Sequence, residues 1–426
     1  MKENLPGLDC LRFSLACYLV LFHTLLGYPG VETIPLAGIF KFGGYVTSTF
    51  FILSGFILAH VYVGASTDKE LRVPASVFIF NRFFNIYPIH IITLLLTVGL
   101  MALGSHIYDV DLSWVDSTPP PRYTMSPVEL AVNLIMQVTL LQAWNPFYAT
   151  FNIPAWSLST LFFFYLSFPL LAPRLLRMRR KYAVLLAMWA ACLLPALAVA
   201  LFASGEPWAI GTLHTNPLVR LPEFLAGIVA YGIFTEDDAR ITCFVARHRC
   251  VEILMLAAIF IGAAYLFANG SLFLRVLLHN GIMMPTQIAL ILVCASMLRE
   301  ASQRTVNWAR RLGNASLSIF AIQWPLFILF IKIQKALEIP YPLLSCVHRV
   351  HECVQAVNAA PPRLYYYPAY LLVTLLVSVV FQERVIVPLR NILRRMSGRQ
   401  QRVTAPSAPL VSQPASNARV KEADVS

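Results

Sequence analysis

Residues 8–28 read LDCLRFSLACYLVLFHTLLGY, an apolar run interrupted by Asp9, Arg12 and His23. The run is long enough to cross a hydrocarbon layer of about 30 Å as a helix. It is too long for the apolar region of a signal peptide, and it has no small-x-small cleavage site. We therefore expect a permanent membrane helix at the start of the chain.

The composition extends this expectation to the whole chain. Hydrophobic residues make up 58% of the 426 residues and charged residues 13%, against about 25% charged in soluble domains. The mean hydropathy is +0.66. We expect an all-α, polytopic integral membrane helix bundle of about ten transmembrane helices, with spans near residues 8–28, 43–63, 83–103, 157–173, 182–203, 217–235, 251–268, 281–298, 315–334 and 365–387.

The net charge of +12 follows the positive-inside rule and does not indicate a nucleic-acid partner, because the basic residues cluster in short loops. With ten spans and a cytoplasmic N-terminus, the basic loop at residues 174–181 lies inside. Counting the apolar segment 127–144 as another span would place that loop outside and invert every later one. We therefore predict that 127–144 is a re-entrant or interfacial helix on the outer side and that both termini are cytoplasmic.

The predicted domain organisation is simple. Residues 1–390 form one membrane domain, and residues 391–426 form a basic cytoplasmic tail whose Ser, Pro, Ala and Gln content predicts disorder. No soluble catalytic domain is evident, so any chemistry must reside in the bundle or its loops.

Three ionisable residues in the first run are candidates for function, because an isolated charge within a span costs several kcal/mol. On a helix Asp9, Arg12 and His23 share one stripe, with Asp9 and Arg12 spaced to pair. A single membrane histidine is also often a packed helix contact. The aligned Asp-x-x-Arg pattern favours a functional role, and histidine is well suited to remove a hydroxyl proton near neutral pH.

Six segments in order resemble the acyltransferase-3 family of membrane acyltransferases, over roughly residues 5–390. They are Gly7 to Arg12 followed by His23; Phe50 to Phe56; Arg82 with Ile86-Tyr87-Pro88; Trp156-Ser157-Leu158 with Phe164, Tyr165 and Pro169; Arg220 to Phe224 with Gly227; and Gly313 to Trp324-Pro325.

The resemblance implies a membrane O-acyltransferase. It would transfer an acyl group, by expectation acetyl, from acyl-CoA to a hydroxyl of a polysaccharide, its lipid-linked precursor or another glycoconjugate. Acetyl-CoA would be a co-substrate, with no bound cofactor and no metal. The bilayer, the acyl-CoA donor and the carbohydrate acceptor are the expected partners, and the bacterial inner membrane is the expected location.

The resemblance also assigns residues. The catalytic role falls on His23 as general base, supported by Asp9 and Arg12. Arg82 and Tyr87 are the candidates for the CoA donor, since guanidinium groups suit phosphates. The substrate candidates are Ser54, Trp156, Ser157, Tyr165, Arg220, Glu223 and Gln323.

Several of these residues have a simpler explanation. Arg82 could be an ordinary positive-inside residue. Ser54 beside Gly55 is typical of close helix packing. Trp156 and Tyr165, which could form a platform for a sugar, equally suit a membrane interface.

Three positions depart from the family pattern. Leu161 stands where many members have an acidic residue, Gln323 replaces the histidine of His-Trp-Pro, and Asn85 replaces a second arginine before Tyr-Pro. Glutamine forms hydrogen bonds but does not carry a proton near neutral pH. These changes favour a subfamily with a different acceptor. The changes at Leu161 and Gln323 also permit a non-catalytic partner in polysaccharide assembly. A multi-span bundle with buried charge leaves open a transporter or export component.

A cluster in the predicted outer loop permits three interpretations. Cys346, His348, His351 and Cys353 could bind zinc, although the spacing matches no standard site. A disulfide in an oxidising compartment is a second interpretation, and unconnected residues are a third.

Overall fold

The computed structural model describes residues 5–33, 37–64, 68–103, 107–112, 121–203, 205–339 and 350–396. Within these ranges ten helical segments are long and apolar enough to cross a membrane, which confirms the predicted all-α bundle. The spanning helices are α1 (Pro6–Thr24), α2 (Gly43–Tyr62), α3 (Ala75–Leu103), α5 (Trp156–Arg177), α6 (Lys181–Phe202), α7 and α8 (Pro207–Thr215 and Pro217–Glu236), α9 (Asp238–Asn269), α10 and α11 (Leu272–His279 and Met284–Ser296), α12 (Gln303–Leu337), and α14 and α15 (Tyr367–Phe381 and Val387–Met396).

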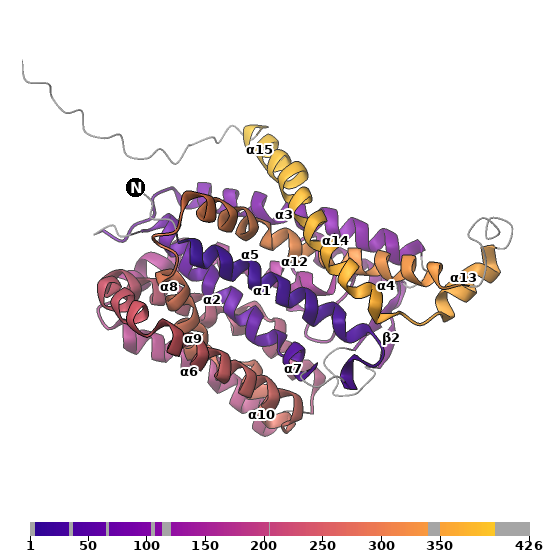
Figure 1. Cartoon of the computed structure of the whole chain (residues 1–426), viewed down its shortest axis with the longest axis horizontal. Coiled ribbons are helices and arrows are strands. Elements are labelled where there is room, and N and C mark those ends of the chain that lie inside the picture. The colour runs from indigo at the N-terminus through magenta and orange to yellow at the C-terminus, as the bar shows by residue number, and fades with distance from the viewer. Residues whose placement is uncertain are drawn as a thin grey trace, which may run out of the picture.

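Helix α1 lies in the middle of the bundle, with α2 and α12 on its two sides (Figure 1). It packs chiefly on α12, whereas α2 packs chiefly on α8. The α2–α8 contact is close because glycines face backbone across it. A Cβ on Gly55 would lie 2.0 Å from the Phe224 carbonyl oxygen, and one on Gly227 would lie 1.8 Å from that of Ile52. Close approach over small residues is the usual way in which membrane helices associate.

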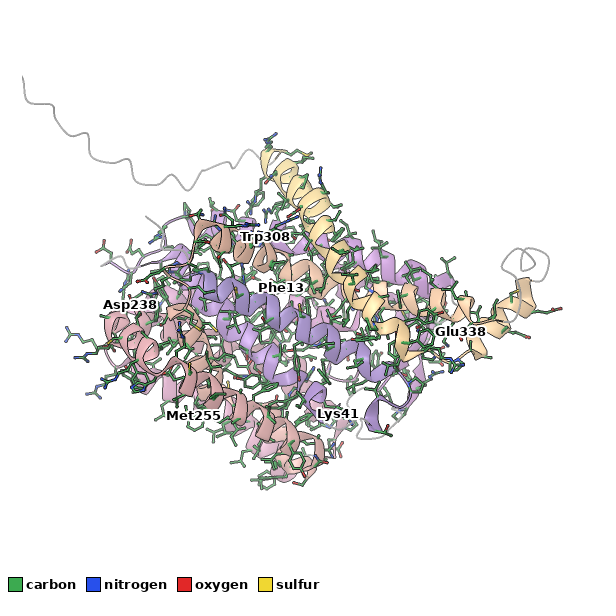
Figure 2. All side chains as sticks on the ribbon, in the orientation of Figure 1. Phe13, Lys41, Asp238, Met255, Trp308 and Glu338 are labelled. Carbon is green, nitrogen blue, oxygen red and sulfur yellow. The ribbon has the colours of Figure 1, made fainter. Side chains whose placement is uncertain are left out.

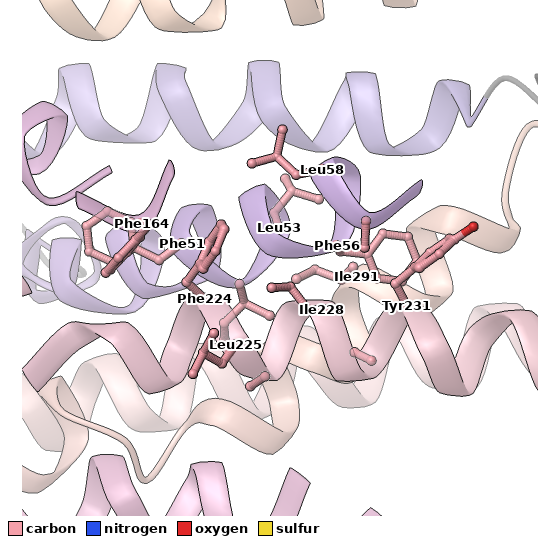
Figure 3. Packing of buried hydrophobic residues seen from close by; sticks show 14 of the residues in the cluster. Phe51, Leu53, Phe56, Leu58, Phe164, Phe224, Leu225, Ile228, Tyr231 and Ile291 are labelled. Atoms are coloured by element: carbon pink, nitrogen blue, oxygen red, sulfur yellow. The ribbon is translucent and has the colours of Figure 1, made fainter. Parts of the chain in front are cut away.

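Aromatic side chains fill the space beside this crossing (Figure 3). The rings of Phe51 and Phe164 meet edge to face at 5.2 Å, and those of Phe164 and Phe224 stack at 5.0 Å. All three side chains are fully buried. They join α2, α5 and α8 into one core, which supports the wall of the site described below.

Several helices are longer than their apolar runs. Helices α3, α9 and α12 begin at residues 75, 238 and 303. The apolar runs in the sequence begin later, near residues 83, 251 and 315. The added turns of α9 and α12 are polar and basic. Arginine is a good helix former, so the helix continues beyond the apolar layer. Figure 2 shows Asp238, the first residue of α9, and Glu338, just after α12, at opposite ends of the bundle.

The segment predicted to be re-entrant or interfacial contains α4 (Pro127–Val138), which has 12 residues. At 1.5 Å per residue it is about 18 Å long, too short for a full span. Its position relative to the membrane stays a prediction. Hydrogen bonds from the Tyr123 hydroxyl and from the backbone and side chain of Ser126 lower the pKa of Glu129, so the carboxylate that caps α4 is charged at neutral pH. Before α4, strands β1 (Asp109–Asp111) and β2 (Arg122–Thr124) form an antiparallel hairpin.

The last spanning segment is not a regular α-helix throughout. Between α14 and α15 the residues Gln382–Ile386 form a π-helical turn. Helix α15 then continues past residue 390, the predicted end of the membrane domain, to Met396. The rest of the predicted tail lies outside the described residues, and the domain boundary stays a prediction.

The cysteine and histidine cluster of the predicted outer loop is only partly described. Cys353, on α13 (Val350–Ala359), is disulfide-bonded and buried. A thiol in a disulfide is not available as a thiolate ligand for zinc. Cys346 and His348 lie outside the described residues.

Candidate active site

A cavity of about 390 Å³ opens among α1, α2, α3, α5, α12 and the α14–α15 segment. We call it the arginine cavity, because four arginines contribute to its wall. Its polar lining consists of Arg12, Thr47, Ser54, Arg82, Asn85, Ser157, Tyr165, Arg311, Asn314, Ser316, Gln382, Glu383 and Arg390. Its volume is in the range usual for small-molecule sites.

Two of the four arginines have a carboxylate partner. Arg12 Nη2 donates to Asp9 Oδ1 at 2.6 Å, as the spacing of these residues on one helix predicts. Arg311 binds both carboxylate oxygens of Glu383, at 2.5 and 3.0 Å. These pairs hold the two guanidinium groups in place at the cavity wall.

The other two cavity arginines are paired, among the residues that the structure describes, with neutral groups. Arg82 donates to the Tyr62 hydroxyl at 2.6 Å, and Arg390 donates to Asn85 Oδ1 at 2.6 Å. Within that part of the chain each retains a buried Nε–H without an acceptor. Arg390 is also close enough to Arg82 and to Arg394 for their charges to interact. A cluster of guanidinium groups favours binding of a polyanion.

His23 lies on the last turn of α1, one turn beyond Leu19. Its Nδ1 is 2.8 Å from the Leu19 carbonyl oxygen, which can only accept a hydrogen bond. Nδ1 must therefore carry the proton, and in the neutral imidazole the lone pair is on Nε2. The Leu19 carbonyl thus selects the tautomer in which Nε2 can act as a base.

The His23 ring is not part of the wall of the arginine cavity but lies next to two residues that are. Leu19 and Phe320 both line the cavity, and the Phe320 ring meets the His23 ring edge to face at 6.3 Å. On the other side, Gln323 Nε2 lies 3.3 Å from Nδ1 and donates to the Phe320 carbonyl oxygen at 3.0 Å. Because Gln323 Nε2–H and His23 Nδ1–H are both donors, Gln323 packs against the ring, and the hydrogen bond to Leu19 orients the imidazole.

The other predicted site residues divide into two groups. Ser54, Ser157 and Tyr165 line the arginine cavity. Tyr87 stacks on the ring of Phe83 at 4.5 Å and is not part of the cavity wall. Trp156 is 7% exposed, too buried to offer its face to a sugar.

Arg220 and Glu223 lie in a separate buried network between α2, α8 and α10. Their side chains form an ion pair at 3.1 Å. Ser48 bridges them, since it accepts from Arg220 at 2.8 Å and donates to Glu223 at 3.0 Å. Arg220 also donates to Asn280 at 3.3 Å. This network lies behind the cavity wall, where the Arg220 guanidinium faces the ring of the cavity residue Phe51 at 5.5 Å.

Two histidines that the sequence reasoning missed extend this network. His214 Nδ1 and His279 Nε2 are 3.1 Å apart, so one ring donates to the other. The His214 ring also contacts Trp156 at 4.7 Å, and His279 contacts Asn280 at 3.3 Å. Both histidines lie in helices that belong to apolar segments. The rule that selected His23, an ionisable residue in an apolar segment, would have selected them too.

The three departures from the family pattern all occur at the site. Asn85 is the residue that binds Arg390. Leu161 lines the arginine cavity. Gln323 contacts His23. The three departures therefore lie in the arginine cavity or in contact with His23.

Together, the fold and the site define a polytopic membrane protein whose bundle contains a cavity lined by arginines, with a buried histidine beside it. A family model described as an acyltransferase domain matches residues 5–383, and the chain belongs to this family, acyltransferase-3. This match confirms the predicted family and, at the level of the family, the enzyme class of acyltransferase.

The chain is 32% identical to the acyltransferase MdmB of Streptomyces mycarofaciens over 203 residues. That alignment includes 44% of this chain and 46% of the relative, so the chain spans about half the length of this relative. No solved structure matches the chain significantly.

Proposed function

We propose that the protein is an O-acyltransferase of the bacterial inner membrane. It transfers an acyl group, acetyl in the first instance, from acyl-CoA to a hydroxyl of a polysaccharide, its lipid-linked precursor or another glycoconjugate. The observation that carries this proposal is His23, whose Nδ1 is held by the Leu19 carbonyl, next to the residues Leu19 and Phe320 of a cavity lined by arginines. A base and an anion site in this arrangement suit attack by a hydroxyl on a CoA thioester.

The donor enters the arginine cavity. The cavity is smaller than a whole CoA molecule, so the acyl group and its arm occupy it while the phosphates stay among Arg82, Arg390 and Arg394. The Nε–H groups of Arg82 and Arg390 that lack acceptors supply hydrogen bonds to those phosphates. Each charge-assisted hydrogen bond of this kind contributes about 1.5–3 kcal/mol.

The proposed reaction conserves its protons. His23 Nε2 takes the proton of the acceptor hydroxyl as the oxygen attacks the thioester carbonyl carbon. The tetrahedral intermediate then collapses, the carbon–sulfur bond breaks, and the proton on His23 passes to the leaving thiolate. Arg12, held by Asp9, lies on the cavity wall about 16 Å along α1 from His23, at 1.5 Å per residue, and there it contacts the donor rather than the reacting carbonyl.

The test compares the O-acyl content of cell-surface glycoconjugates by proton NMR. Cells carry the intact gene, a deletion, His23→Ala, or His248→Ala at matched membrane levels. His248 is an exposed histidine on α9, outside the site. We expect the acyl signals to disappear in the deletion and in His23→Ala and to persist in His248→Ala. With purified protein, His23→Ala should lower turnover about 10²–10⁴-fold and leave CoA binding unchanged.

Two results would count against the proposal. Acyl signals that survive in His23→Ala but not in the deletion would remove His23 as the base. A wild-type protein that binds no CoA, with no acyl difference between intact and deletion cells, would favour a transporter or a non-catalytic partner.

A further inference from the structure

A second cavity lies at the β1–β2 hairpin. It encloses about 250 Å³ between the hairpin, the segment 149–153 and α12. We call it the hairpin groove, and its lining includes Asp109, Asp111, Arg122, Phe151, Trp324 and Ile328. Strand β2 lies at the end of the bundle away from the N-terminus (Figure 1).

One face of α12 connects this groove to the arginine cavity. Gly313, Leu317 and Phe320 line the arginine cavity, and Trp324 and Ile328 line the groove. These positions are spaced by three or four residues, so they lie on one stripe of the helix. Phe320 and Trp324 are about 6 Å apart along the axis at 1.5 Å per residue. His23 contacts this stripe at Phe320, between the two cavities.

The segment 149–153, which forms one wall of the groove, is hydrogen-bonded to α12 one turn before Pro325. Pro325 has no N–H to donate to the carbonyl of Ala321, four residues earlier. Asn152 Nδ2 donates to that carbonyl oxygen instead, at 3.0 Å. The preceding residue, Phe151, has a φ of 54°, a conformation that non-glycine residues adopt only when the surroundings hold them in it. The groove wall is therefore fixed by tertiary contacts.

The chemistry of the groove suits a sugar. Asp111 and Arg122 have side chains that are 51% and 81% exposed and lie 3.8 Å apart, so both are accessible to a ligand in the groove. Trp324 is partly exposed, and its indole N–H donates no hydrogen bond to the described residues. An aromatic face packs on the C–H groups of a sugar ring, and carboxylate and guanidinium groups bind its hydroxyls.

We propose that the hairpin groove binds the acceptor as a glycosyl unit and presents one of its hydroxyls to His23. This inference rests on the proposed function, because it gives His23 a donor cavity on one side and an acceptor groove on the other. Trp324 packs on the sugar ring, while Asp109, Asp111 and Arg122 bind its hydroxyls. Trp324 takes the role that the sequence analysis considered for Trp156 and Tyr165.

The test uses two variants, Trp324→Leu and the double variant Asp109→Asn/Asp111→Asn. Trp208→Leu is the matched control, because Trp208 is 50% exposed on α7 and lines neither cavity. Acetyl-CoA affinity is measured on purified protein in nanodiscs, and O-acyl content on cell-surface glycoconjugates. We expect both groove variants to reduce O-acyl content at least about tenfold, with acetyl-CoA affinity within twofold of wild type. Trp208→Leu should match wild type in both assays.

A binding experiment separates failure of the groove from failure of the proposed function. Methyl glycosides are added to the protein, and saturation-transfer NMR measures their contact with it. Contact that Trp324→Leu removes would support the groove as a sugar site even if no acyl transfer occurs. Glycoside contact that is absent in wild type or unchanged in Trp324→Leu would overturn the groove. Equal loss of acetyl-CoA affinity and acyl transfer would overturn it as well, because the variant would then affect the donor.

Discussion

The carbonyl of Leu19 determines how His23 can react. A histidine four residues beyond a helix carbonyl can donate its Nδ1–H back to that carbonyl as a second hydrogen bond, and the 2.8 Å contact shows that it does. The ring then presents Nε2 to a substrate without the need for a carboxylate partner. In acyl-transfer sites of the triad type an acidic residue has this orienting role. Here the main chain of α1 supplies it.

Arg390 gives a residue-scale prediction about the donor. At a CoA concentration of 100 times the dissociation constant, wild-type protein should gain about 2.7 kcal/mol of stability. Removing one charge-assisted contact in Arg390→Met should weaken binding about tenfold or more. The stabilisation at the same CoA concentration should then fall to about 1.4 kcal/mol or less.

The measurement is the melting temperature in detergent with and without CoA. Arg249→Met is the control, because Arg249 is exposed on α9 and lies outside the arginine cavity. An undiminished CoA-induced shift in Arg390→Met would exclude Arg390 from the donor site.

For single residues, the sequence predicted a contact within α1 but not the contacts between different helices. Helical spacing alone predicted the Asp9–Arg12 pair, because both residues belong to one helix. The sequence predicted no site role for Arg390, at the end of the membrane domain, or for Arg394, in the basic tail, because that role depends on α15 packing against α3. That packing is a tertiary contact. No local pattern in the chain encodes it.

The crossing of α2 and α8 gives a prediction at the scale of the element. Gly227→Ala would place a methyl group against the Ile52 carbonyl and force the two helices apart. Overpacking of this kind costs about 1–3 kcal/mol. The measurement is the free energy of unfolding in detergent, together with turnover, because α2 also carries the wall residues Thr47 and Ser54.

Gly262→Ala is the matched control for this prediction. Gly262 lies within α9, and a Cβ there meets no atom within 4 Å. Alanine is the better helix former by about 1 kcal/mol, so this variant should be neutral or slightly more stable. Equal stability of the two variants would show that the α2–α8 contact is looser than the structure indicates.

The existence of the helices was more predictable than their ends. Apolar length predicted the ten spans, because the hydrocarbon layer sets that length. It did not predict where α3, α9 and α12 begin, since a helix can continue into the aqueous region wherever its residues favour it. Nor did it predict the β1–β2 hairpin, whose strands are three residues each.

At the scale of the whole molecule, the predicted orientation remains to be tested. Cys243 and Cys250 are exposed thiols on the basic first half of α9, which the positive-inside rule places in the cytoplasm. In spheroplasts, single-cysteine variants that retain either thiol should react with a membrane-impermeant maleimide only after permeabilisation. Tyr123→Cys, on the hairpin, should react without permeabilisation. The opposite pattern would invert the bundle and place the arginine cavity on the wrong side for cytoplasmic CoA.

The whole architecture could be predicted in outline because the bilayer limits the choices. Every backbone polar group within the membrane must be satisfied internally, which leaves the helix bundle as the fold for apolar runs of this length. The two cavities could not be predicted in the same way. They arise from the packing of α12 against α1 and against the loops, and their linings draw on residues separated by hundreds of positions.

The π-helical turn at Gln382–Ile386 has a consequence for chain length. A π-helical turn contains one residue more than an α-helical turn. The extra residue is accommodated within the turn, so the helix on either side of it keeps its phase. A homologue that lacks one residue there and forms a regular α-helix would still present Arg390 to the cavity. A one-residue gap in an alignment at this turn therefore leaves donor binding unchanged, whereas a one-residue deletion within α14 would rotate Arg390 by about 100° away from the cavity.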